Sequence, residues 1–214
     1  FNNYNFKECL RNTLILSLYS LIVTTPCSIL LALALNYVGN ARFKKTVQMI
    51  TYCPYFISTI VFVGIINKMF DNRMGVLGSF LYNHFGINVL GSPEIFPSLY
   101  VWSGVWQGVG FGAIIYIAAL AGVDMQQHEA AIMLILNMGS VLNIGYEKVL
   151  AMQNQNNMAV SEVITTYSYK VSLVSTFPDY AYSTAIGLFQ SLVGLVLILI
   201  TNKIANKVSG NGFM

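Results

Sequence analysis

The residue types that most often carry out chemistry in proteins are few in this sequence and lie far apart. The two histidines, His84 and His128, belong to different polar links, and Cys9, Cys27 and Cys53 lack the spacing of a metal site. The sequence contains no Gly-x-x-x-x-Gly-Lys-Ser/Thr loop for nucleotide phosphates. An enzyme would need its catalytic or metal-binding groups clustered. We therefore expect no enzyme and no cofactor bound by this chain.

The elements that must position the remaining polar side chains are apolar helices. Of the 214 residues, 56% are hydrophobic and 9% are charged, whereas ordinary soluble domains carry about 25% charged residues. A helix of about 20 residues crosses a hydrocarbon core of about 30 Å. Predicted spans cover residues 13–35, 47–69, 98–123 and 185–200, with a shorter apolar run at 132–144. The sequence thus predicts an all-α integral membrane protein and excludes a water-soluble fold.

Prolines and small residues predict the shape and packing of these spans. Pro26 and Pro54 predict kinks in the first and second spans. The third span carries several small residues, which favour close approach between membrane helices. These are Gly104, Gly108, Gly110, Gly112 and Ala113.

The short apolar run at 132–144 decides the predicted topology. Its length is typical of a re-entrant segment rather than a full span. If it crosses the membrane, Lys203 and Lys207 join Arg42, Lys44 and Lys45 on the cytoplasmic side, where basic residues gather. We therefore expect five crossings, with the N-terminal end of this chain outside. The external segments are then 70–97, with a short amphipathic helix at 76–85, and 153–180, interpreted as a solvated loop.

The polar residues after the third span resemble a known signature. Residues 118–124 read Ala-Ala-Leu-Ala-Gly-Val-Asp, and residues 128–131 read His-Glu-Ala-Ala. Together they resemble the start of the EAA signature of ABC importer permeases, which forms a cytoplasmic coupling helix that docks on the ATPase subunit. Residues 11–19, 138–147 and 179–190 and the ending Asn-Gly-Phe-Met are similar to the polysaccharide branch of the maltose-type permeases. The resemblance covers nearly the whole chain.

Two departures from the family pattern bear on the domain organisation. Family members have another transmembrane helix before the first span seen here, and a longer loop with a glycine and a proline after the EAA triplet. In this sequence Ala131 runs directly into Ile132. We expect a single permease domain over 1–214, with five visible crossings of six in a type I ABC importer fold. The N-terminal helix and about 20 residues after Ala131 are then absent, which explains the short span.

The resemblance implies a transport subunit that forms half of a pathway for an oligosaccharide, with ATP and Mg²⁺ bound by the partner ATPases. The coupling residues carried over from the family motif are Asp124, His128, Glu129, Ala130 and Ala131. Sugars are bound through hydrogen bonds and aromatic stacking, so the expected pathway residues are rings and amides within the spans. They are Tyr52, Tyr55, Phe56, Trp102, Trp106, Gln107, Asn137, Asn143, Phe189 and Gln190. Each of them is equally compatible with core packing or an interfacial aromatic belt.

The implied partners are a second homologous permease, two ATP-binding cassette subunits, an extracellular solute-binding protein and the lipid of a bacterial plasma membrane. The expected docking residues for the binding protein are Glu162, Tyr167, Tyr169 and Lys170. No basic stripe for nucleic acid is present. The predicted spans lack ionisable groups at their centres, which argues against ion-coupled carriers. Two alternatives remain open: an importer of the same architecture for a peptide or amino acid, and a membrane-embedded enzyme.

Overall fold

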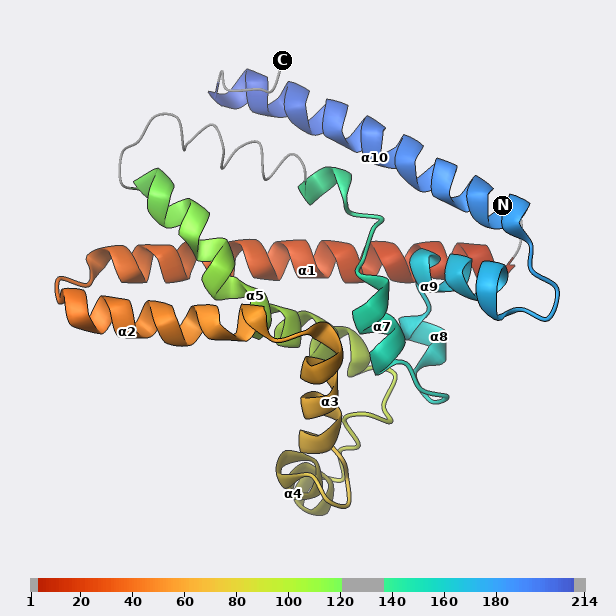
Figure 1. The fold of residues 1–214 in the computed structure, drawn as a ribbon, viewed down its shortest axis with the longest axis horizontal. Helices are drawn as coiled ribbons and strands as arrows, with labels where there is room; N and C mark the ends of the chain where they lie inside the picture. The colour runs from red at the N-terminus through yellow and green to blue at the C-terminus, as the bar shows by residue number, and fades with distance from the viewer. Residues whose placement is uncertain (1–3, 121–136, 210–214) are drawn as a thin grey trace.

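The computed structural model describes residues 4–120 and 137–209, and every regular element in these ranges is a helix (Figure 1). The long helices are α1 (Tyr4–Tyr37), α5 (Phe96–Leu120) and α10 (Tyr180–Ser209). Shorter helices are α2 (Ala41–Tyr52), α3 (Thr59–Met69), α4 (Val76–Phe85), α7 (Tyr146–Met152), α8 (Met158–Ser161) and α9 (Ile164–Tyr169). A 3₁₀ turn, η1 (Cys53–Phe56), follows α2, and a π turn, η2 (Lys170–Val174), follows α9.

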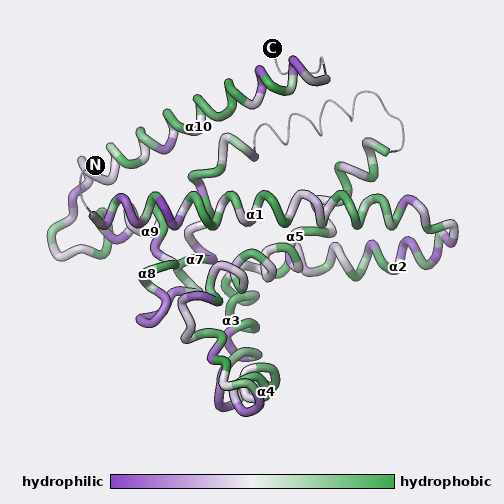
Figure 2. Tube along the Cα trace, turned by 180° about the vertical axis from the view of Figure 1, so that it is seen from behind, coloured by the Kyte–Doolittle hydropathy of each residue, from purple (hydrophilic) through white to green (hydrophobic). Residues whose placement is uncertain are grey.

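Three of the described helices are long and apolar enough to cross a bilayer. These stretches are Asn5–Tyr37, Phe96–Ala118 and Tyr180–Lys207. They contain most or all of the spans predicted at 13–35, 98–123 and 185–200. Green, hydrophobic segments recur along α1, α5 and α10 in Figure 2, and many of their large apolar side chains, such as Ile22, Leu30, Trp106 and Leu192, are exposed. The prediction of an all-α membrane protein is therefore confirmed.

The second predicted span is broken rather than kinked. Residues Ala41–Phe56 and Thr59–Met69 meet at an angle of 99°. Pro54 has no backbone N–H and lies in the 3₁₀ turn. Ser58 then caps α3, its side chain accepting a hydrogen bond from the Val61 N–H. The expectation of one kinked helix over 47–69 is thus wrong, because the chain ends one helix and caps a new one. By length and composition the bent pair qualifies as a fourth span.

The fifth predicted crossing lies partly outside the described residues. Residues 132–136 are not described. Residues 137–139 are helical, and the chain then turns and enters α7. The described residues therefore contain three spans, or four with the bent pair. Five crossings remain a prediction.

Small residues of α5 allow it to pack closely on its neighbours, as the sequence predicts. A Cβ at Gly110 would overlap the backbone of Thr51 in α2. A Cβ at Gly112 would lie 2.8 Å from the Ser28 Oγ in α1. Ala113 is fully buried. By contrast, Pro26 is accommodated inside α1 without ending the helix.

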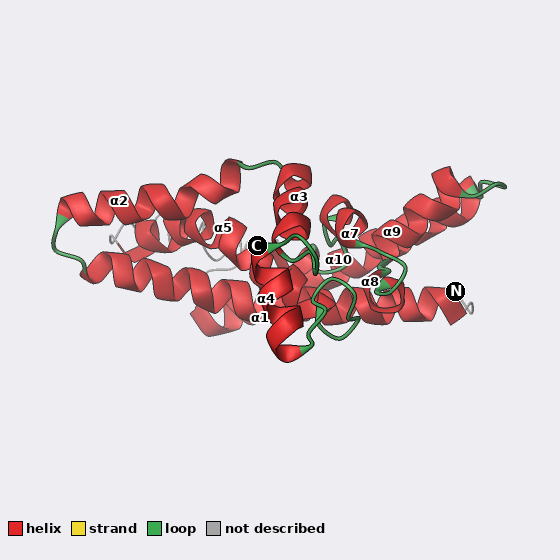
Figure 3. Ribbon diagram, turned by 90° about the horizontal axis from the view of Figure 1, so that it is seen from below, coloured by secondary structure: helices red, strands yellow, loops and turns green. Residues whose placement is uncertain are grey.

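The expectation of a solvated loop over 153–180 is wrong. This segment folds into α8, α9 and η2, and buries Val163, Ile164 and Thr166 completely. Its backbone is tied to α1: the Ile164 N–H donates to the Thr13 Oγ1 at 2.9 Å, and the Asn12 amide donates to two carbonyls at 2.9 and 3.1 Å. Figure 3 shows α7, α8 and α9 near the N-terminal half of α1, away from α2.

The short helix predicted within segment 70–97 is confirmed, while the external location of this segment stays a prediction. Helix α4 spans Val76–Phe85, the range expected from the sequence. It ends at Gly86, whose φ of 67° lies in the left-handed region that glycine adopts without strain.

Candidate functional site

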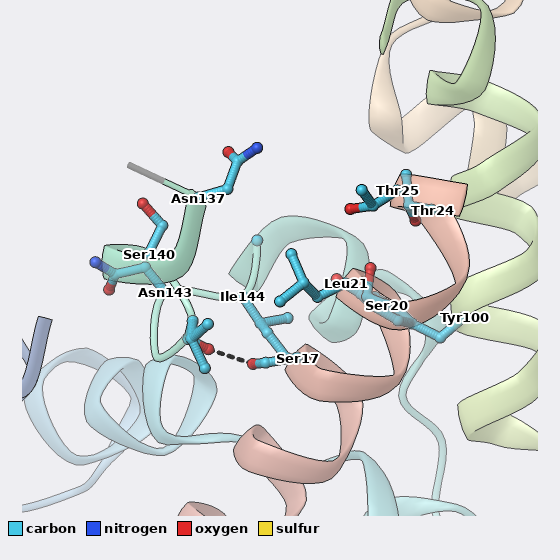
Figure 4. A pocket seen from close by; sticks show the side chains of 12 residues that line it. Ser17, Ser20, Leu21, Thr24, Thr25, Tyr100, Asn137, Ser140, Asn143 and Ile144 are labelled. Carbon is cyan, nitrogen blue, oxygen red and sulfur yellow. Dashed lines mark hydrogen bonds between the residues drawn. The ribbon is translucent and has the colours of Figure 1, made fainter. Parts of the chain in front are cut away.

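The first cavity, here named the polar pocket, lies between α1, α5 and the turn before α7. Its volume is about 320 Å³, and Figure 4 shows side chains from α1 on one side and from the turn on the other. Its polar lining consists of Ser17, Ser20, Thr24, Thr25, Tyr100, Asn137, Ser140 and Asn143. The lining therefore offers hydroxyls and amides, and none of its described residues is charged.

The α1 residues of the polar pocket share one face because they recur every three or four positions along the helix. Ser17 is committed to structure, since its Oγ bonds the Thr13 carbonyl at 2.6 Å and the Val141 carbonyl of the facing turn. Among the described residues, the hydroxyls of Ser20 and Thr24 have no hydrogen-bond partner. They are available to a bound solute.

The second cavity, here named the aromatic groove, runs along the break between α2 and α3. Its volume is about 470 Å³. Tyr55 stacks on Phe111 with ring centroids 4.0 Å apart, and Phe56 is 79% exposed. The Gln107 amide donates to the Ile57 carbonyl at 3.0 Å, which holds α5 against the residues that follow the 3₁₀ turn. The remaining lining is Ser58, Thr59, Gly104 and Gly108.

A lysine that sequence reasoning missed lies between the two cavities. Lys148 belongs to α7, which is too short to cross a membrane, and is only 9% exposed. Its Nζ donates to the Tyr100 carbonyl at 3.0 Å and lies over the rings of Tyr100 and Phe62, 4.7 and 5.5 Å from their centroids. Burial lowers the pKa of Lys148 from 10.5 to about 8. The sequence signal that could have revealed this residue is a lysine placed shortly after the apolar run at 132–144.

The predicted pathway residues do not form one site. Tyr55, Phe56 and Gln107 line the aromatic groove, whereas Asn137 and Asn143 line the polar pocket. The other predicted pathway residues line neither cavity and fall into two groups. Trp102, Trp106 and Tyr52 lie on helix surfaces, while Phe189 and Gln190 hold α10 in place.

Ring stacking and a hydrogen bond hold three of these residues against neighbouring helices and turns. The Trp106 ring stacks on Phe62 with centroids 5.5 Å apart. Phe189 meets Phe6 of α1 edge-on at 5.8 Å, and the Gln190 amide donates to the Leu142 carbonyl at 2.9 Å. Phe189 and Gln190 therefore stabilise the packing of α10 rather than line either cavity.

The predicted docking residues lie in α9 and directly beside its two ends. Lys170 and Glu162 form an ion pair at 2.8 Å, and both are about one-quarter exposed. Tyr167 packs edge-on against Tyr182, and Tyr169 lies against Tyr146. The coupling residues Asp124, His128, Glu129, Ala130 and Ala131 lie outside the described residues.

Comparison with known proteins decides the family. No family model matches the chain. Protein LplB of Bacillus subtilis is 36% identical over 99% of the chain and 74% of its own length. The polygalacturonan/rhamnogalacturonan transport system permease protein YteP of the same organism is 34% identical with the same coverage. The chain belongs to the ABC sugar-importer permeases.

Solved structures agree with this assignment of the permease. A chain of a bacterial alginate ABC transporter, solved in complex with an alginate pentasaccharide-bound periplasmic protein, matches with a TM-score of 0.90 and 28% identity. The match covers 99% of the permease and 82% of that chain. A second structure, of an importer of the acidic polysaccharide alginate, matches with a TM-score of 0.89. The type I importer fold expected from the EAA resemblance is confirmed.

The permease is a transport subunit and not an enzyme, in keeping with its relatives. Its described residues contain no group of three or more histidine, cysteine, aspartate or glutamate side chains that could hold a metal ion. The polar pocket and the aromatic groove offer a solute hydroxyls, amides and aromatic faces.

Proposed function

We propose that this permease forms half of the translocation pathway for an oligosaccharide that an extracellular solute-binding protein delivers. The observation that supports this most directly is the polar pocket, whose uncharged hydroxyls and amides match the hydrogen-bonding groups of a sugar. The aromatic groove adds exposed rings, on which the apolar faces of sugars stack. The relatives include permeases named for polygalacturonan and for arabinooligosaccharides.

The proposed assembly contains a second homologous permease and two ATP-binding cassette subunits in a bacterial plasma membrane. ATP and Mg²⁺ belong to the cassette subunits. Residues Asp124, His128, Glu129, Ala130 and Ala131 would make the coupling contact, with a carboxylate at the first turn of a short helix and small residues for close approach. The alignments with the Bacillus subtilis relatives extend over 238 positions, more than the 214 residues of this chain. That difference is consistent with residues absent after Ala131 from a single permease domain.

The surface around α9 is the proposed docking site for the binding protein. It combines the Glu162–Lys170 ion pair with the rings of Tyr167 and Tyr169. Charged groups at the rim of an interface set the rate and register of protein association, and this ion pair is partly exposed. The proposed topology places this surface outside, with the tail lysines Lys203 and Lys207 inside.

The test uses the complete importer in proteoliposomes with its binding protein. Thr24→Leu fills the polar pocket with an apolar side chain, and Ile22→Leu changes the exposed side of the same helix as a control. We expect Thr24→Leu to reduce oligosaccharide uptake by about tenfold, a loss of about 1.4 kcal/mol, and the control to retain uptake. Equal uptake by both variants contradicts the pocket assignment. Stimulation of ATP hydrolysis by a peptide or amino acid alone contradicts the oligosaccharide assignment.

A further inference from the structure

Lys148 is a buried cation with no anionic partner in the described part of the chain. It is nine-tenths buried, and the ion pair that the structure records elsewhere joins Lys170 to Glu162. The ammonium makes one hydrogen bond, to the Tyr100 carbonyl, although it has three N–H donors. Among the described residues the other two N–H groups have no hydrogen-bond partner, and the nearby rings of Tyr100 and Phe62 are a weak substitute for water or a carboxylate.

A buried charge is costly unless a partner satisfies it, so an unpartnered one is a candidate functional group. Met, Leu or Gln would fill the same space between α3, α5 and α7 without that cost. The neighbouring charged residue on α7, Glu147, is exposed and points no carboxylate within ion-pair distance of Lys148. The packing of the described residues alone gives no reason for a cation here.

The position of the ammonium relates it to both cavities. Tyr100, whose carbonyl it bonds, lines the polar pocket, and Gly104, one turn along α5, lines the aromatic groove. A Cβ at Gly104 would lie 3.2 Å from the Lys148 Nζ, so the glycine allows the ammonium to approach α5 closely beside the aromatic groove. Lys148 itself lines neither cavity, and the described lining of both contains no charged side chain, so its ammonium is the charge that lies directly behind their shared wall on α5.

We propose that Lys148 recognises a carboxylate of the solute, and that the permease carries acidic, uronate-containing oligosaccharides. This inference rests on the proposed function as an oligosaccharide pathway. An ammonium and a carboxylate form a charge-assisted hydrogen bond, and the two free N–H groups of Lys148 supply the donors. Acidic sugar polymers are also named for two proteins similar to this chain, polygalacturonan for one and alginate for the other.

The experiment compares one acidic oligosaccharide with its neutral form. Oligogalacturonate and the same oligosaccharide with its carboxyl groups reduced to alcohols are offered to the complete importer in proteoliposomes, after binding of each to the solute-binding protein is measured. Uptake is recorded for the wild type, Lys148→Met and Lys148→Gln, with exposed Lys45→Met as the matched control. We expect both Lys148 variants to lose uptake of the acidic form by about tenfold to a hundredfold, as for a hydrogen bond to a charged group. Uptake of the neutral form is expected to stay within about twofold of the wild type.

Each outcome has a definite meaning. Equal loss of both forms overturns the proposal, because Lys148 then supports folding or movement rather than recognition. Unchanged acidic uptake in both variants overturns it as well. A wild-type importer that carries only the neutral form refutes the role of Lys148 but leaves the oligosaccharide pathway standing. If the wild-type importer binds and carries neither form, this result contradicts the proposed function as an oligosaccharide pathway.

Discussion

Replacing the buried ammonium of Lys148 by a neutral side chain of similar length is expected to stabilise the permease. Burial lowers the pKa of Lys148 from 10.5 to about 8, and because one pKa unit corresponds to about 1.4 kcal/mol, the charge costs the folded chain about 3 kcal/mol at neutral pH. Lys148→Met removes that cost and retains contact with the rings of Tyr100 and Phe62. The Tyr100 carbonyl keeps a donor, since the Ser103 hydroxyl also bonds it at 3.0 Å.

The pH dependence of this stabilisation has a definite sign. Below pH 8 the lysine is protonated in the folded and the unfolded chain, so the full cost applies to the wild type. Between pH 8 and 10.5 the unfolded chain binds the proton and the folded chain does not, so wild-type stability rises with pH. The advantage of Lys148→Met therefore shrinks across this interval. Among the described residues, the titratable side chain recorded against the ammonium is Tyr100, which both proteins share.

Thermal unfolding of the detergent-purified importer at pH 7 and pH 10 measures this effect. An advantage of about 3 kcal/mol corresponds to a rise in melting temperature of roughly 5 to 10 °C for a chain of this size. Lys45→Met, at an exposed position, is expected to leave the melting temperature unchanged. A lower melting temperature for Lys148→Met, or an advantage that is the same at both pH values, refutes the reasoning.

Three further substitutions test neighbouring parts of the structure. Gly104→Ala places a Cβ 3.2 Å from the ammonium, so the apparent affinity for an acidic oligosaccharide in uptake assays should fall by about tenfold while the neutral form is unaffected. Glu162→Lys sets two cations side by side with Lys170 on the proposed docking surface. It should weaken binding-protein-dependent uptake but leave ATP hydrolysis in detergent intact; failure of the complex to assemble argues against docking. Gly194→Val directs its Cβ at the Gly139 carbonyl, 2.8 Å away, and should destabilise the chain by about 1 to 3 kcal/mol in thermal unfolding.

The features that the sequence predicts well are those that depend on local composition. Apolar runs long enough to cross a bilayer locate α1, α5 and α10, and the glycine that follows residues 76–85 marks the end of α4. The glycines at 110 and 112 predict close packing, since a missing side chain is visible in any sequence. The sequence does not show which helices these glycines pack against. The contacts with Thr51 and Ser28 are known only from the structure.

The features that the sequence does not predict depend on contacts between distant residues. Pro54 indicates a perturbed helix, but the 99° bend also requires a new N-cap at Ser58. The polar segment 153–180 has the composition of a solvated loop. Its buried backbone groups are paired with Asn12 and Thr13, about 150 positions earlier in the chain. For the same reason the predicted rings and amides divide between two cavities and the packing of α10.

In the proposed pathway, the two cavities and Lys148 behind them divide recognition between groups of different strength. Hydroxyls and amides of the polar pocket form neutral hydrogen bonds, each with a modest net free energy because they replace bonds to water. A pathway built only from such groups releases its solute readily but distinguishes poorly between sugars of similar size. The ammonium of Lys148 adds one strong and directional group, and cation–π contact with Tyr100 and Phe62 restrains its affinity for a passing carboxylate by holding it in place. In this proposal, the unpaired ammonium that recognises a solute carboxylate destabilises the protein while no solute is bound. Lys148→Met is therefore expected both to raise the melting temperature and to abolish the preference for acidic solutes.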